Sequence, residues 1–199
     1  EQSVHKALPI WSHMANENWC MIGYHSVSVL ADAVAKGLPL DKEEVLKAMV
    51  SSSTIPYLDG TGEYMEKGYV ALDHNGSAAS LTLEYAYDDW TIYHTALLAG
   101  NRSVADTYKK RAVNYENVFD TNIGYARPRY ADGRWKENFN LLSTHGEGFI
   151  EGNALNYSFY VPQDVNNMIR LMGGEKSFVS KLDSLFTMHL PAEFFAQTE

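Results

Sequence analysis

The sequence contains little cysteine, no cluster of basic residues and no long apolar run. Cys20 is the only cysteine, so no disulfide can form within the chain and the compartment cannot be deduced from thiols. The apolar neighbours Trp19 and Met21 indicate that this thiol is buried. No stretch reaches the roughly 18 apolar residues of a membrane-spanning helix, and we therefore expect no membrane partner.

Positive charge is also scarce. Lys and Arg number 16 against 25 Asp and Glu, which gives a formal net charge of −9. A nucleic-acid partner requires clustered basic side chains, so nucleic-acid binding is excluded. The excess of carboxylates is compatible with acid–base chemistry or with a hard cation such as calcium, although simple solubility is the more common cause.

Compact motifs for metals, nucleotides and nucleophiles are missing. The seven His residues form no HxxxH or HExxH pattern, and no EF-hand loop, P-loop, GxGxxG or GxSxG motif occurs. Ser26 follows His25 without a companion signature, so we interpret it as structural. The first residues are not a signal peptide and lack an initiator Met, and we expect the chain to be a processed product or a fragment.

The hydrophobic pattern predicts an all-α protein. Helices are expected over residues 20–36, 41–52, 80–99, 103–118, a stretch from 153 broken at Pro162, 164–172 and 177–188. The apolar face of the helix over 80–99 is assigned to Leu83, Tyr87, Trp90, His94 and Leu97. Residues 54–76 and 119–150 are expected to be long functional loops. Helices joined by such loops suit an α/α toroid, and an irregular bundle is the alternative.

The densest group of carboxylates lies in the segment EYAYDDW. Glu84 and Asp88 are four residues apart and share one helix face, where like charges repel each other. They therefore need donors, which sugar hydroxyls, a cation or an Arg could supply. A buried hydrogen-bonding network to Arg127 or Arg129 is an equally weighted interpretation.

A second acidic segment, EGFIEGN, follows a glycine-rich loop. Gly152 allows the backbone to approach a ligand closely, and Glu151 precedes an expected helix. Apolar neighbours such as Ile150 or Tyr157 favour the protonated form that a general acid needs near neutral pH. The alternative is that Glu151 only caps the helix N-terminus.

Together these segments resemble glycoside hydrolase family 92, the calcium-dependent, inverting exo-α-mannosidases. The resemblance extends over nearly the whole chain, and TLEYAYDDW followed by EGNA is highly specific. The matching positions are Leu8–Trp11, Asn16–Ser26, Asp32–Ala33, Lys36–Gly37, Lys67–Val70, Thr82–Trp90, Arg127–Arg129, Gly133, Trp135, Glu151–Ala154, Tyr157, Val161–Pro162, Asp164–Val165 and Leu171–Gly174.

The resemblance implies a β-sandwich followed by an (α/α)6 toroid, of which residues 1–199 form one incomplete segment with long loops at the active-site end. Glu151 would be the general acid. Inversion needs a second carboxylate about 6.5–9.5 Å away as the base, which in the family lies in a later segment beyond Glu199. Calcium would help to bind and distort mannose, with ligands mostly outside this chain. We therefore expect the isolated chain to be inactive unless another chain supplies the remainder.

The other site residues follow from the same resemblance. Residues expected to bind substrate or support the site are Glu84, Asp88, Asp89, Asn153, Arg127 and Arg129. The two arginines are expected to neutralise the carboxylates, whereas Tyr85 and Trp90 are assigned to the core. Family members often carry Trp, Gln and His where this chain has Leu155, Asn156 and Gln163, so the linkage preference is open.

The expected function is hydrolysis of terminal α-linked mannose, with α-1,2 linkages favoured, from mannose-rich glycans by a secreted or periplasmic enzyme. Two alternatives stay open. One is another (α/α)6 glycosidase, and the other is a non-catalytic carbohydrate-binding or assembly module of the same fold.

Overall fold

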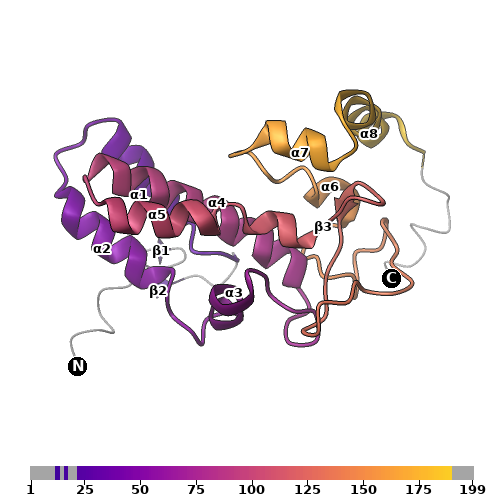
Figure 1. Cartoon of the computed structure of the whole chain (residues 1–199), viewed down its shortest axis with the longest axis horizontal. Coiled ribbons are helices and arrows are strands. Elements are labelled where there is room, and N and C mark those ends of the chain that lie inside the picture. Colours follow the sequence, from indigo (N-terminus) through magenta and orange to yellow (C-terminus); the bar gives the residue numbers. More distant parts are fainter. Residues whose placement is uncertain (1–11, 14–15, 18–21, 190–199) are drawn as a thin grey trace.

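The computed structural model describes residues 12–13, 16–17 and 22–189. The interpretation of Cys20 and the first part of the helix expected from residue 20 lie outside these residues. The described chain is mostly helical, as predicted, and has two short antiparallel strand pairs (Figure 1). These pairs are β1 (Ser12–His13) with β2 (Asn16–Glu17) and β3 (Phe119–Asp120) with β4 (Tyr125–Ala126).

The long helix α4 (Ala78–Leu98) is the centre of the molecule. Helices α1 (Ser26–Ala35), α2 (Lys42–Ser52) and α5 (Arg102–Arg111) pack around it (Figure 1). Local signals place their ends. The Asp41 carboxylate accepts hydrogen bonds from Glu43 N and Glu44 N and so caps the start of α2.

Helix α4 contributes to two hydrophobic clusters at once. Its residues Leu81, Tyr85 and Ile92 pack in a cluster shared with α1, α2 and α5. Leu83 and Ala86 point into a second cluster, which is completed by residues from the C-terminal half of the chain. Because both sides of α4 are covered, a single amphipathic stripe does not describe it.

The predicted apolar face of α4 is therefore wrong beyond its first member. Leu83 is fully buried, but Tyr87 and Trp90 are only half-buried, His94 is exposed and Leu97 is 40% exposed. Tyr87 and Trp90 stack on each other with ring centroids 6.3 Å apart. The assignment to the core is confirmed for Tyr85, which is 1% exposed, and is wrong for Trp90.

The two long segments predicted as loops contain short regular elements. Residues 54–76 include α3 (Thr61–Lys67), which begins and ends at glycines in left-handed conformation. Val70 N then donates to the Thr82 hydroxyl at 3.0 Å, so this segment is tied to α4. Residues 119–150 begin with the β3–β4 hairpin and continue without further helix or strand elements.

The helices between α4 and α8 are shorter than predicted, whereas α8 is one residue longer than the range expected for it. The single helix expected over residues 103–118 divides into α5 and the 3-10 helix η2 (Asn114–Val118). The stretch from residue 153 forms one turn, α6 (Ala154–Tyr157), followed by α7 (Val165–Leu171) and α8 (Glu175–Thr187). Gly173 and Gly174, which fall between the two predicted ranges, separate α7 from α8 with φ angles of 98° and 91°.

Helices α6 to α8 lie toward the end of α4 that is far from α1 and α2 (Figure 1). Over the residues that the structure describes, no helix combines the length and the apolar character needed to cross a bilayer.

Candidate active site

Glu84 and Asp88 lie on one face of α4, as their spacing predicts, and His25 bridges them. His25 Nε2 is 2.8 Å from Glu84 Oε2, and its Nδ1 is 2.8 Å from Asp88 Oδ1. The second oxygen of Asp88 accepts from Tyr24 N at 2.8 Å. The repulsion expected between the two carboxylates is thus relieved by the imidazole of His25, which immediately precedes α1 and is distant in sequence from α4.

These contacts control the ionisation of the group. Burial alone lowers the pKa of His25, but the hydrogen bonds and charges of Asp88 and Glu84 outweigh it and raise this pKa from 6.5 to about 10. Burial raises the pKa of Asp88 to about 6, although His25 opposes that shift. Near neutral pH, His25 is an imidazolium between two carboxylates.

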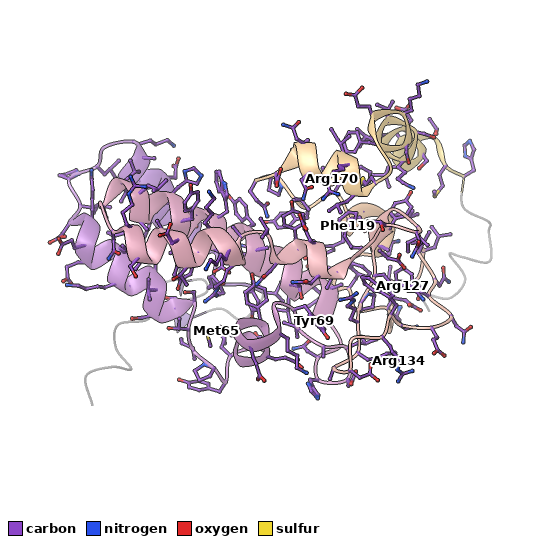
Figure 2. All side chains as sticks on the ribbon, in the orientation of Figure 1. Met65, Tyr69, Phe119, Arg127, Arg134 and Arg170 are labelled. Atoms are coloured by element: carbon purple, nitrogen blue, oxygen red, sulfur yellow. The ribbon has the colours of Figure 1, made fainter. Side chains whose placement is uncertain are left out.

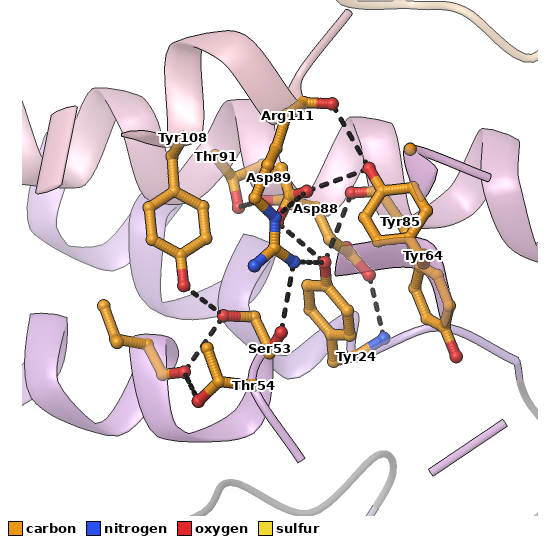
Figure 3. Close-up of polar contacts among 12 residues, drawn as sticks. Tyr24, Ser53, Thr54, Tyr64, Tyr85, Asp88, Asp89, Thr91, Tyr108 and Arg111 are labelled. Atoms are coloured by element: carbon orange, nitrogen blue, oxygen red, sulfur yellow. Dashed lines mark hydrogen bonds and ion pairs between the residues drawn. The ribbon is translucent and has the colours of Figure 1, made fainter. Parts of the chain in front are cut away.

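The third carboxylate of this segment, Asp89, is held by a different set of partners, which include Arg111 and Tyr64 (Figure 3). It is fully buried, and Arg111 Nε lies 2.8 Å from its Oδ2. The hydroxyls of Tyr24 and Tyr64 donate to its two oxygens at 2.7 and 2.9 Å. Arg111 also donates to the carbonyl of Ser53 at 3.1 Å, so this network joins α2, α4 and α5.

The predicted neutralisation by Arg127 and Arg129 is wrong. Arg127 Nη1 pairs with Asp120 at 2.9 Å, in the half of the molecule that holds α6–α8 (Figure 2). The Arg129 guanidinium lies over the Trp135 ring, 4.0 Å from its centroid. Among the described residues, the ion pairs of the α4 carboxylates are with His25 and Arg111, and neither Arg127 nor Arg129 takes part in them.

Glu151 lies in the loop before α6 and its side chain is exposed. Its φ angle is 52°, a left-handed conformation that non-glycine residues rarely adopt and that is enriched at functional sites. The alternative that Glu151 caps the helix is wrong. Asn153 is the N-cap of α6, and its side chain accepts from Leu155 N and Asn156 N.

The loop around Glu151 is docked on the first turns of α4. The carbonyl of Gly148 accepts from Ala79 N at 2.9 Å and from Ser80 N at 3.2 Å. A side chain at Gly148 would be 2.7 Å from Pro128, so only glycine fits there. Two residues after this contact, Ile150 N donates to the Ser80 hydroxyl at 3.2 Å.

Glu147, the other acidic residue of this segment, is largely enclosed. Its carboxylate is 3.0 Å from Lys136 Nζ, and the residue is 8% exposed. Of the two carboxylates in EGFIEGN, only Glu151 is therefore open to a reactant from solvent.

Two of the three departures from the family pattern, Leu155 and Asn156, lie in α6, and Gln163 follows that helix. Leu155 is buried and lines a hollow of about 470 Å³ together with Phe139, Leu142 and Met188. Asn156 completes the capping box by accepting from Asn153 N at 2.8 Å. The side-chain nitrogen and oxygen of Gln163 are both buried and have no hydrogen-bond partner among the residues that the structure describes.

The carboxylates of α4 do not fit a calcium site. Within residues 22–189, no group of three or more Asp, Glu, His or Cys side chains converges as metal ligands would. Glu84 and Asp88 are engaged by His25, and Asp89 by Arg111. We therefore assign these residues to the framework of the site rather than to metal binding.

The sequence interpretation missed His25 and Arg111 as the cations of this network. His25 lies in one of the matched segments, which was a signal that could have identified it. Arg111 ends a run of basic residues on α5 and has no local signature. Its role depends on the packing of α5 against α4.

A family profile described as the glycosyl hydrolase family 92 catalytic domain matches residues 1–198. A family GH92 α-mannosidase from Bacteroides thetaiotaomicron is 40% identical, with a TM-score of 0.89 over 96% of this chain and 25% of that protein. The same mannosidase has been solved in complex with mannoimidazole.

Two further proteins are similar. A family GH92 inverting mannosidase from the same bacterium is 33% identical, with a TM-score of 0.83 over 89% of this chain and 25% of that protein. An uncharacterized secreted glycosidase from Arthroderma benhamiae is 26% identical over 82% of this chain and 26% of its own length. The chain spans about a quarter of the length of these relatives.

Proposed function

Because the chain belongs to the glycosyl hydrolase family 92 catalytic domains, we propose that the whole protein hydrolyses terminal α-linked mannose, with α-1,2 linkages as the expected substrate. The observation that carries this proposal is the exposure and the backbone conformation of Glu151. It is an exposed carboxyl group, held in a left-handed conformation on a loop docked to the central helix. A general acid needs this combination of access and fixed position.

In the proposed reaction, the protonated Glu151 donates its proton to the glycosidic oxygen as the bond from that oxygen to the mannose C1 breaks. Water attacks C1 from the opposite face and loses a proton to a second carboxylate, so the released mannose has inverted configuration. Glu84 is unsuited to be this base because His25 and Tyr157 already bind its oxygens. We expect the base outside the described residues.

Several parts of the proposal depend on the rest of the protein. The described helices would form part of an (α/α)6 toroid, with the Glu151 loop at its active-site end. Calcium would assist mannose binding through ligands outside the described residues. A secreted or periplasmic location is supported by the secreted relative.

The test is the release of mannose from α-1,2-linked mannobiose, measured with calcium and then with EDTA. We expect the full-length protein to be active with calcium and the 199-residue chain to be inactive alone. Glu151→Gln should lower kcat of the full-length protein by about a hundredfold or more, since it removes the donated proton.

The control is Glu66→Gln, which changes an exposed carboxyl group of α3. It should leave kcat unchanged. Cleavage of gluco- but not manno-disaccharides would favour another toroidal glycosidase. Binding of mannose without any hydrolysis would favour a non-catalytic carbohydrate-binding module.

A further inference from the structure

The loop that carries Glu151 has a second attachment to α4, made by a residue that comes after Glu151 in the chain. Tyr157, the last residue of α6, donates from its hydroxyl to Glu84 Oε1 at 2.6 Å. The first attachment is the Gly148 carbonyl on Ala79 N and Ser80 N, with Ile150 N on the Ser80 hydroxyl. The loop is thus fastened on both sides of Glu151 to a single helix.

Tyr157 also contacts the loop itself. A Cβ at Gly152 would be 2.9 Å from the Asn156 side chain and 3.3 Å from the Tyr157 ring, so both side chains lie close to the residue that follows Glu151. Burial and the charge of Glu84 raise the pKa of the Tyr157 hydroxyl, so it remains a donor. A displacement of this ring would move the backbone beside Glu151.

The acceptor of this hydrogen bond is itself immobilised. Glu84 is 8% exposed, and its other oxygen, Oε2, is 2.8 Å from His25 Nε2. His25 is in turn paired with Asp88 one turn further along α4. Glu84 therefore cannot follow the loop if the loop moves, and it acts as a fixed point for Tyr157.

We propose that Tyr157 and Glu84 form a positioning pair that sets the place of Glu151 relative to the bound sugar. This inference rests on the proposed function, because it assigns Glu151 as the proton donor. Neither member of the pair is expected to touch the reacting atoms. Their effect is on proton transfer, because a misplacement of a reacting group by about 1 Å can cost up to a hundredfold in rate.

The test compares Tyr157→Phe with the unaltered full-length protein on two substrates. Mannobiose has a poor leaving group that needs protonation, whereas 4-nitrophenyl α-mannoside has a leaving group that departs with little help from an acid. We expect kcat on mannobiose to fall about tenfold, with KM unchanged. On the aryl mannoside, kcat should fall by less than about twofold.

The control is Tyr115→Phe. Tyr115 also donates a hydroxyl to a carboxylate, Asp164 Oδ2 at 2.9 Å, but it joins η2 to the start of α7. Removal of the Tyr115 hydroxyl should lower the melting temperature without changing the ratio of kcat on mannobiose to kcat on the aryl mannoside. Ser80→Ala removes the acceptor of Ile150 N and should lower kcat on mannobiose relative to kcat on the aryl mannoside, as Tyr157→Phe does. It serves as the test if Tyr157→Phe does not fold.

An equal loss on both substrates, or no loss, would overturn the positioning role and leave the proposed function intact. No hydrolysis of either mannoside by the unaltered full-length protein would overturn the proposed function and the positioning role with it.

Discussion

Two acidic regions lie along the same helix and differ in almost every physical respect. In the middle of α4, Asp88 and Asp89 are fully buried, and His25 and Arg111 neutralise their charges. At the loop docked on its first turns, Glu151 is exposed and makes no ion pair within the described residues. Neutralised, buried carboxylates hold helices together, whereas an exposed carboxyl group on a fixed loop is available for chemistry.

The difference is also visible in the backbone. Asp88 and Asp89 lie inside a regular helix, where the backbone is unstrained, while Glu151 has a positive φ angle. Left-handed conformation in a non-glycine residue costs of order 1 kcal/mol or more and persists only where the surrounding structure imposes it. The strained backbone at Glu151 thus lowers the stability of the fold somewhat, and it fixes the position of this side chain.

The largest expected effect is a loss of stability on breaking the buried ion pair between Asp89 and Arg111. Arg111→Met should lower the free energy of unfolding by about 3–5 kcal/mol, because it leaves Asp89 buried without its cation. Urea unfolding of the 199-residue chain measures this. The control is Arg134→Met, which removes an exposed ion pair with Asp132 and should change stability by less than about 0.5 kcal/mol. Similar losses in both variants would contradict the assignment.

The next effect is a dependence on pH. The pKa of His25 is raised from 6.5 to about 10 in the folded chain, so the folded state holds this proton more tightly than the unfolded state. Its contribution to stability is complete below about pH 6.5 and is lost as the pH rises toward 10. The free energy of unfolding should therefore decline over this interval, by an amount on the order of 2–4 kcal/mol.

His25→Asn removes the titrating group and should flatten this decline, whatever the absolute stability of the variant. The measurement is urea unfolding at several pH values between 6.5 and 10. A slope that persists unchanged in the variant would show that other groups cause it.

The smallest effect is expected at Glu151. Glu151→Gly should leave stability unchanged or raise it by up to about 1 kcal/mol, because glycine adopts positive φ without strain. Thermal unfolding of the chain measures this, with Glu66→Gly in α3 as a control that should destabilise by about 0.5–1 kcal/mol. Destabilisation by Glu151→Gly would mean that this side chain has a structural role.

The sequence predicted the helical class and most helix positions, because caps, glycines and apolar spacing are local signals. It misjudged α4, because the stripe from Leu83 to Leu97 assumes one buried face and α4 is covered on two sides. It also chose the wrong arginines. Arg127 and Arg129 lie in one of the matched motifs and Arg111 does not. Arg111 nevertheless reaches Asp89 because α5 packs along α4.

The sequence by itself determined that the chain is helical, that Glu84 and Asp88 share a face, and that EGNA resembles the acid-bearing motif of one glycosidase family. These properties depend on neighbours within a few residues or on similarity of letters. Only the tertiary structure decided which cations meet which carboxylates and that Glu151 is left exposed. Such pairings join residues such as Tyr24 and Asp89, or Glu84 and Tyr157, that are separated by 65 and 73 positions and meet only when the helices pack.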